Sequence, residues 1–316
     1  MKLASIDIGT NTLRLLIGQV DGNGHIHDAV LKREITRLGG GFHGKKLHSD
    51  AKKRTLAALK GFALTLAEQG IKNVNASATS VIREAEDGHL FIDEIKVKTG
   101  IHAEVISGSR EAALTLEGVL SALHGRERTA LIFDIGGGST EYIIAEKARV
   151  KGLKSLNMGV VSMTEKYLAS DPPSQKDIEK ISSVVEGFLA ELKKELPQLP
   201  VIEKAHEPLL VGTAGTITTL AALHQDLKVY DSGKINNYVL TKQAIEALFQ
   251  RLCRMTHSGR ASIEALEEGR ADLIIAGTII VLKTMEEFRF NEMTISDYGL
   301  LEGLLIDLSR RKGAIP

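Results

Sequence analysis

Three short turns of glycine, serine and threonine carry the residues that could do chemistry. They are the segments DIGTNT at 7–12, DIGGGST at 134–140 and GTAGTIT at 212–218. Small side chains let the backbone N–H groups of such turns approach a ligand, and hydroxyl groups add donors, which is how turns and helix N-termini bind phosphate. We therefore interpret the three segments as phosphate-binding turns, with a plain strand-to-helix turn as the alternative for GTAGT.

Two of these turns begin with an aspartate at the end of an apolar run, Asp7 and Asp134. Hard cations such as Mg²⁺ prefer carboxylate, water and phosphate oxygens. The two aspartates therefore predict a divalent cation between them, in a cleft that grips a phosphate chain from both sides.

The same two turns indicate an internal repeat. Both read D-I-G-x-x-[ST], and the second lies 127 positions after the first (134 − 7). Each is followed by patterns typical of two further strands. We interpret the repeat as two copies of one domain that begins with a β-hairpin, facing each other, with coincidence as the alternative.

The elements that must position these turns alternate between strand and helix, which predicts an α/β fold. Three strands are expected at the N-terminus, with turns at 9–12 and 21–24, and three more from residue 129. The expected helices cover 49–69, 90–99, 109–123, 174–196, 241–253, 270–288 and 300–310, and further strands cover 74–78, 102–106, 209–211 and 293–296. The repeat predicts domains at 1–124 and 125–299. Whether the last helix, within 300–316, packs on the first domain is left open.

Composition excludes several classes of protein. The 316 residues carry 40 basic and 40 acidic side chains, and aromatic residues make up 4% with no tryptophan, which argues against general binding to nucleic acid or membranes. A single cysteine, Cys253, excludes an internal disulfide and a cysteine zinc site. The longest apolar run, 273–282, is too short to span a bilayer, and no signal-peptide core precedes it, so we expect a cytoplasmic protein.

Other motifs are absent or misplaced. Gly39, Gly41 and Gly44 match G-x-G-x-x-G, but Lys45 and Lys46 follow where a dinucleotide-binding helix would begin. There is no P-loop and no G-x-S-x-G nucleophile motif. Nine basic against two acidic residues within 32–60 could steer an anionic chain, although a solvated surface explains most of them equally well.

The ordered set of motifs resembles the exopolyphosphatase/guanosine pentaphosphate phosphatase (Ppx/GppA) family of the actin-like ATPase superfamily. The resemblance extends from Ile6 to Gly303. It is carried by DIGTNTLRL, RLGGG, ATSVIREA, ISGSREAAL, DIGGGSTE, VGTAGTITTLAA, RADLIIAG and SDYGLLEG. It implies two actin-like (ribonuclease H-like) domains, each a mixed sheet with flanking helices, an active-site cleft between them, and removal of a terminal phosphate by water.

The resemblance also implies roles for individual residues. Glu111 matches the glutamate that orients or deprotonates the attacking water, Arg83 an arginine directed at phosphate, and Glu141 an acidic residue tied to metal and catalysis. The implied metal ligands are Asp7, Asp134 and Glu141. The implied phosphate-binding residues are Thr10, Asn11, Thr12, Arg14, Arg37, Gly136, Gly137, Gly138, Ser139, Thr213, Gly215 and Thr216.

The expected activity is Mg²⁺-dependent hydrolysis of the terminal phosphate of inorganic polyphosphate. The chain ends soon after GLLEG, where long relatives continue into a helical domain, so we expect short polyphosphates. Guanosine pentaphosphate is the alternative substrate; a sensor of guanosine tetra- or pentaphosphate and an actin-like kinase are more remote alternatives. Relatives commonly carry arginine where this chain has Leu301. A homodimer is left open.

Overall fold

The computed structural model describes residues 1–42, 45–196 and 207–313. The chain folds into two units. Unit 1 comprises Met1–Ala122 together with the segment that begins at Tyr298, and unit 2 comprises Leu123–Asp297. Within the described residues, no helix has both the length and the apolar character needed to cross a membrane.

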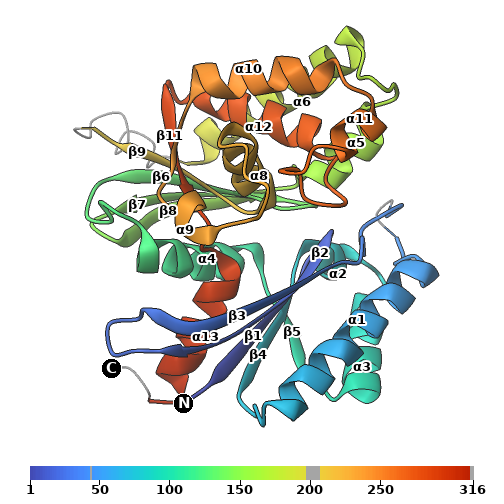
Figure 1. Cartoon of the computed structure of the whole chain (residues 1–316), viewed down its shortest axis with the longest axis vertical. Coiled ribbons are helices and arrows are strands. Elements are labelled where there is room, and N and C mark those ends of the chain that lie inside the picture. The colour runs from blue at the N-terminus through green and yellow to red at the C-terminus, as the bar shows by residue number, and fades with distance from the viewer. Residues whose placement is uncertain (43–44, 197–206, 314–316) are drawn as a thin grey trace. The chain divides into compact units, whose positions relative to one another are not determined.

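Unit 1 is built on a mixed five-stranded sheet (Figure 1). Its strands are β1 (Leu3–Ile8), β2 (Thr12–Val20), β3 (Ile26–Ile35), β4 (Val74–Ala78) and β5 (Ala103–Val105), in the order β3-β2-β1-β4-β5. The first three strands pair antiparallel, as short turns between them require, whereas β4 and β5 run parallel to β1.

Helices cover both faces of this sheet. Side chains alternate along β1, so Ile6 points to the face covered by α1 (Ser49–Glu68) and α3 (Gly88–Thr99). Leu3 points to the opposite face and packs on α13 (Leu300–Arg311). On that face α13 also lies against α4 (Gly108–Ala122), as Figure 1 shows. The C-terminal helix therefore packs on unit 1; residues 314–316, part of the predicted segment 300–316, lie outside the described residues.

Unit 2 contains a mixed six-stranded sheet in the order β10-β11-β9-β6-β7-β8. Its strands are β6 (Ala130–Ile135), β7 (Thr140–Glu146), β8 (Arg149–Leu156), β9 (Leu209–Thr213), β10 (Val239–Thr241) and β11 (Glu292–Ser296). Strands β6, β7 and β8 form an antiparallel meander, and β9 pairs parallel with β6. This arrangement repeats that of β1, β2, β3 and β4 in unit 1.

The main core of unit 2 lies between one face of this sheet and a layer of helices. The layer is formed by α5 (Val160–Tyr167), α6 (Gln175–Glu195), α8 (Gly215–His224), α10 (Lys242–Cys253) and α12 (Ile274–Glu287). Figure 1 shows α6, α10 and α12 on the same side of the sheet. Phe133 and Tyr142 point into this core and stack with ring centroids 6.0 Å apart. Since side chains alternate along a strand, the neighbouring Asp134 and Glu141 point to the opposite face.

The predicted elements are present with small changes at their ends. The predicted helix at 270–288 begins at Ile274, because residues 270–273 form a turn. Sequence patterns missed α5, β10 and three helices of four or five residues: α2 (Ser80–Glu84), α9 (Ser232–Ile235) and α11 (His257–Ala261). The three short helices span little more than one turn, so they carry no recognisable 3.6-residue period.

Candidate functional site

The first glycine turn of unit 1 is held by the RLGGG segment. The N–H of Gly39 donates to the carbonyl of Thr10 at 2.7 Å, and the N–H of Arg37 donates to that of Asn11 at 2.9 Å. A Cβ on Gly39 would lie 2.2 Å from the Thr10 methyl group, so only glycine permits this approach. The two predicted segments that carry Thr10, Asn11 and Arg37 thus lie together at one end of the sheet, where Thr12 also pairs with Ile35.

Asp7 and Arg14 form an ion pair across the β1–β2 ladder. They are register partners, and Arg14 donates from Nε at 3.1 Å and from Nη2 at 2.6 Å to the same oxygen, Oδ2 of Asp7. Asp7 is 5% exposed. Its other oxygen, Oδ1, is buried and has no hydrogen-bond partner among the described residues. One oxygen of Asp7 is therefore committed to Arg14, and the other is available to a ligand.

The structure brings the predicted catalytic residues Arg83 and Glu111 into contact. Nη1 of Arg83 donates to Oε2 of Glu111 at 3.1 Å and to the carbonyl of Ile106 at 2.9 Å. Glu111 lies in the first turn of α4 and is 8% exposed. Arg83 lies on the short helix α2, whose first residue, Ser80, shares a hydrogen bond of 3.0 Å with the Thr10 hydroxyl. Helix α2 therefore contacts the first glycine turn through Ser80 and Glu111 through Arg83.

In unit 2 the predicted acidic residues lie side by side. Asp134 is the register partner of Glu141 on β7 and of Thr213 on β9, so the three side chains share one face of the sheet. Asp134 is 9% exposed and Glu141 is 1% exposed. Ser155, the register partner of Glu141 on β8, donates its hydroxyl to Oε1 of Glu141 at 2.7 Å. Sequence patterns could not show toward which face of the sheet the Glu141 side chain points. Its pairing with Asp134 between β6 and β7 shows that it points to the same face as Asp134.

The second glycine turn is closed by its own backbone and by the start of α5. The N–H of Gly136 donates to the carbonyl of Ser139 at 2.9 Å, just as Gly9 donates to Thr12 at 3.1 Å in unit 1. The first residues of α5 donate to the carbonyls of Gly136 and Gly137. A Cβ on Gly159, which precedes α5, would lie 2.3 Å from the Gly137 backbone. These contacts use the turn's carbonyl groups.

The third glycine turn opens directly into helix α8. Thr213 ends β9, Ala214 adopts a left-handed φ of 73°, and Gly215 and Thr216 begin the helix. This strand-to-helix geometry suits anion binding at the helix N-terminus, where backbone N–H groups lack partners within the helix.

Arg270 lies beside the third glycine turn and is a candidate site residue that none of the predicted sets includes. It is 9% exposed, and its guanidinium lies so close to Gly215 that a Cβ there would be 2.0 Å from Nη2. Arg270 also forms an ion pair with Glu267. The sequence pattern that could have indicated Arg270 is the motif RADLIIAG, of which it is the first residue. A buried, always-charged donor beside a glycine turn is suited to an anion.

The donor set of unit 2 fits a divalent cation of the Mg²⁺ type. No group of three or more His, Cys, Asp or Glu side chains able to hold a metal occurs among the described residues. Mg²⁺ does not require one, since it usually binds one or two carboxylates and completes its shell with water and substrate phosphate. Asp134 and Glu141 offer two adjacent carboxylates with hydroxyl groups beside them. In unit 1, Oδ1 of Asp7 is a single available oxygen.

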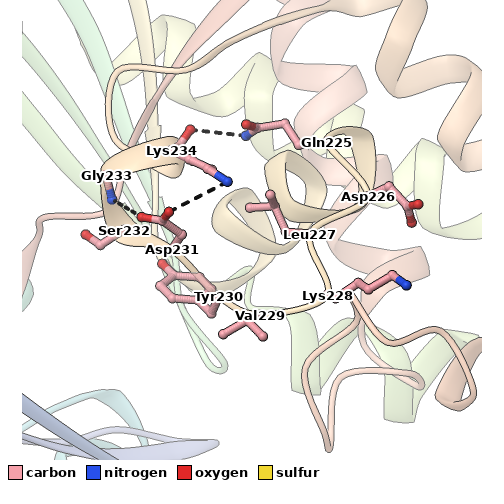
Figure 2. Close-up of a pocket in the computed structure, with 10 residues that line it drawn as sticks. All are labelled: Gln225, Asp226, Leu227, Lys228, Val229, Tyr230, Asp231, Ser232, Gly233 and Lys234. Atoms are coloured by element: carbon pink, nitrogen blue, oxygen red, sulfur yellow. Dashed lines mark hydrogen bonds and ion pairs between the residues drawn. The ribbon is translucent and has the colours of Figure 1, made fainter.

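A concavity of about 760 Å³ lies elsewhere in unit 2 and contains none of the predicted site residues (Figure 2). It is formed by residues 225–234, between α8 and α9. Its polar groups largely bind one another: Gln225 donates to the carbonyl of Lys234 at 3.1 Å, and Asp231 accepts from the N–H of Gly233 at 3.0 Å. We assign it no chemistry.

The position at which the resemblance would place an arginine is filled by an apolar contact. Leu301 is 1% exposed and packs with Leu3 and Leu16 between α13 and the sheet of unit 1. Its carbonyl accepts from the Ser5 hydroxyl at 2.7 Å. Leu301 therefore anchors α13 and has no polar atom in its side chain with which to hold a phosphate.

Comparisons with known proteins identify the family. The family model for the Ppx/GppA phosphatase family matches residues 17–312. Exopolyphosphatase 2 of Mycobacterium tuberculosis is 32% identical over 98% of both chains. A guanosine-5'-triphosphate,3'-diphosphate pyrophosphatase of Vibrio parahaemolyticus is 28% identical over 96% of this chain and 59% of its own.

Solved structures agree with this result. An exopolyphosphatase-like protein matches with a TM-score of 0.89 and 30% identity, over 99% of this chain and 100% of its own. The Ppx/GppA family member of Aquifex aeolicus matches with a TM-score of 0.81 and 32% identity, over 99% and 98% of the two chains. These comparisons confirm the predicted fold class of two actin-like domains, each a mixed sheet with flanking helices. The chain belongs to the Ppx/GppA phosphatase family and is an enzyme that hydrolyses phosphoanhydride bonds.

Proposed function

We propose that this protein is an exopolyphosphatase, which removes the terminal phosphate of short inorganic polyphosphates with Mg²⁺. The observation that carries the proposal is the Arg83–Glu111 pair of unit 1, together with the adjacent carboxylates Asp134 and Glu141 of unit 2. The similarity to exopolyphosphatase 2 along the whole chain supports the choice of substrate.

Unit 1 supplies the groups that act on water and phosphate. Glu111 is nearly buried, and the proposed role is to orient the attacking water and accept its proton as the new P–O bond forms. Arg83 holds one oxygen of Glu111 and brings a permanent positive charge next to it. That charge would also stabilise the negative charge of the transferred phosphoryl group.

The glycine turns supply neutral donors to phosphate oxygens. In the proposed site, the hydroxyl groups of Thr12, Ser139 and Thr216 and the N–H groups of their turns donate to phosphate oxygens. Arg14 and Arg37 add charge beside the first turn. Polyphosphate presents only phosphate oxygens to a protein. A site made from backbone N–H groups and hydroxyl groups is therefore sufficient to bind it.

Asp134 and Glu141, adjacent on one face of the sheet of unit 2, would hold Mg²⁺. When bound, the ion neutralises phosphate oxygens and polarises the bond that breaks. The residues of unit 2 then have two tasks: Asp134 and Glu141 keep their carboxylates fixed on one face of the sheet, and Ser139 binds the phosphate.

Guanosine pentaphosphate is the second candidate substrate, favoured by the similarity to the Vibrio parahaemolyticus pyrophosphatase. Its terminal phosphoanhydride is chemically the same as that of polyphosphate, so the same residues would act on it. The two substrates differ in the nucleoside, for which none of the residues described above provides a specific contact.

Phosphate release decides between these substrates. We would measure it from tripolyphosphate, long polyphosphate, guanosine pentaphosphate and ATP, with and without Mg²⁺. The Glu111→Gln variant preserves shape and a hydrogen bond to Arg83, and should lower kcat by about 10²–10⁴ with little change in KM. Glu117→Gln, at another glutamate of the same helix, is the matched control. Near-normal turnover by Glu111→Gln, or release only from ATP, would contradict the proposal.

A further inference from the structure

Ser155 makes a contact with the candidate metal site that none of the sequence motifs includes. Its hydroxyl donates to Oε1 of Glu141 at 2.7 Å. Ser155 lies on β8 directly opposite Glu141, which in turn lies opposite Asp134. The three side chains therefore form one row across β8, β7 and β6, and Ser155 occupies the end of that row.

Glu141 needs such a donor. It is 1% exposed, and a buried carboxylate is costly unless hydrogen bonds satisfy its oxygens. It also faces Asp134, and like charges opposite one another on neighbouring strands repel. Without the hydrogen bond from β8, it would cost the Glu141 side chain free energy to stay in the row. A rotamer that points away from Asp134 would then be favoured.

The equivalent row of unit 1 shows a different solution to the same problem. There Asp7 faces Arg14, and Arg14 faces Arg33 on β3. The guanidinium of Arg14 binds one oxygen of the Asp7 carboxylate but also cancels its charge. The hydroxyl of Ser155 satisfies one oxygen of Glu141 without bringing a positive charge to it.

We propose that Ser155 is a positioning residue for the metal: its hydrogen bond holds the Glu141 carboxylate in the orientation in which Glu141 and Asp134 together bind a divalent cation. The inference rests on the proposed function, because it takes these two carboxylates as the metal ligands. Hydrogen-bonded partners of metal ligands typically change metal affinity by about 10–100-fold when they are removed.

Two substitutions of identical shape isolate the hydroxyl group. Ser155→Thr and Ser155→Val both introduce a β-branched side chain that suits a strand, and only threonine can donate to Glu141. The first readout is binding of Mn²⁺ to the full chain without substrate, followed by the paramagnetic resonance signal of free Mn²⁺. We expect the valine variant to bind Mn²⁺ about ten-fold more weakly than the threonine variant. Ser155→Ala should resemble valine.

The second readout is the Mg²⁺ concentration that gives half-maximal phosphate release, which should rise in the valine variant, whereas kcat at saturating Mg²⁺ should change little. Ser121→Ala removes a hydroxyl that donates to the carbonyl of Gly118 in unit 1 and is the control. Equal Mn²⁺ affinity of the threonine and valine variants would overturn the role of Ser155. Absence of phosphate release by the wild-type chain would overturn the proposed function, and the Mn²⁺ comparison would still decide about Ser155.

Discussion

Arg14 donates two hydrogen bonds to one oxygen of Asp7 across the β1–β2 ladder, and the position equivalent to Arg14 in unit 2 is Glu141. The repeat thus preserves the aspartate and the backbone turn but reverses the charge opposite the aspartate. One copy carries a neutralised carboxylate with a cation beside it, suited to phosphate. The other carries two carboxylates, suited to a metal ion.

Replacing Arg14 should affect both stability and substrate binding. In Arg14→Ala, Asp7 would remain buried without its cation. Since Arg14 is 22% exposed, we expect a loss of about 2–3 kcal/mol in the free energy of unfolding, at or just below the usual range for breaking a buried pair. We also expect KM to rise about ten-fold through loss of a charged phosphate donor. Urea unfolding and steady-state kinetics measure the two effects.

The double variant Asp7→Asn/Arg14→Met separates the two roles of the pair. Because it removes both charges, it should recover most of the stability. It should not recover the low KM. If activity returns together with stability, Arg14 has only a structural role.

Gly39→Ala tests the contact between the RLGGG segment and the first glycine turn. Its Cβ would lie 2.2 Å from the Thr10 methyl group, so the Thr10 side chain or the turn must move, and we expect a cost of about 1–3 kcal/mol and a higher KM. Gly61→Ala, in the middle of α1 with no heavy atom within 4 Å of the new Cβ, should instead stabilise the protein by about 0.5–1 kcal/mol. Thermal unfolding should therefore give Gly39→Ala a lower melting temperature than the wild type and Gly61→Ala a higher one.

The sequence predicted those features that depend on local pattern. The DIG turns are recognisable because glycine, hydroxyl residues and a strand-ending aspartate are adjacent in the chain. The alternation of apolar and polar residues indicates the strands from which the two sheets are built. Arg37 and Thr10 could be named from motifs, but the contact between their two segments depends on Gly39, and only the three-dimensional structure shows it.

Contacts between segments distant in the chain could not be predicted. Ser155 is fourteen residues from Glu141 in sequence and directly opposite it in the ladder. Arg270 reaches Gly215 through the fold alone. The amphipathic pattern of the last helix shows that one face is buried, but not which core buries it, and the contacts of Leu301 and Leu305 with Leu3 and Leu16 provide the answer.

Gly215→Ala should act through Arg270. The new Cβ would lie 2.0 Å from the guanidinium, which must therefore leave its position. If Arg270 binds the substrate from that position, Gly215→Ala and Arg270→Ala should raise KM by similar factors, and the double variant should be no worse than either. Coupled residues give such non-additive free energies, whereas independent effects add. Additive increases in KM across this double-mutant cycle would show that Arg270 does not act beside Gly215.

The thiol of Cys253 should be unreactive at neutral pH and unnecessary for activity. Burial raises the pKa of Cys253 to about 11, and the nearby Arg260 only partly opposes this shift. The fraction of Cys253 present as the reactive thiolate is then about one in a thousand at pH 8. This fraction increases about ten-fold for each pH unit up to pH 10. The rate of alkylation of the native protein by iodoacetamide should follow the same slope, whereas a rate that levels off below pH 9 would contradict the raised pKa. Cys253 lies on α10, outside the candidate site, so Cys253→Ala should release phosphate at the wild-type rate.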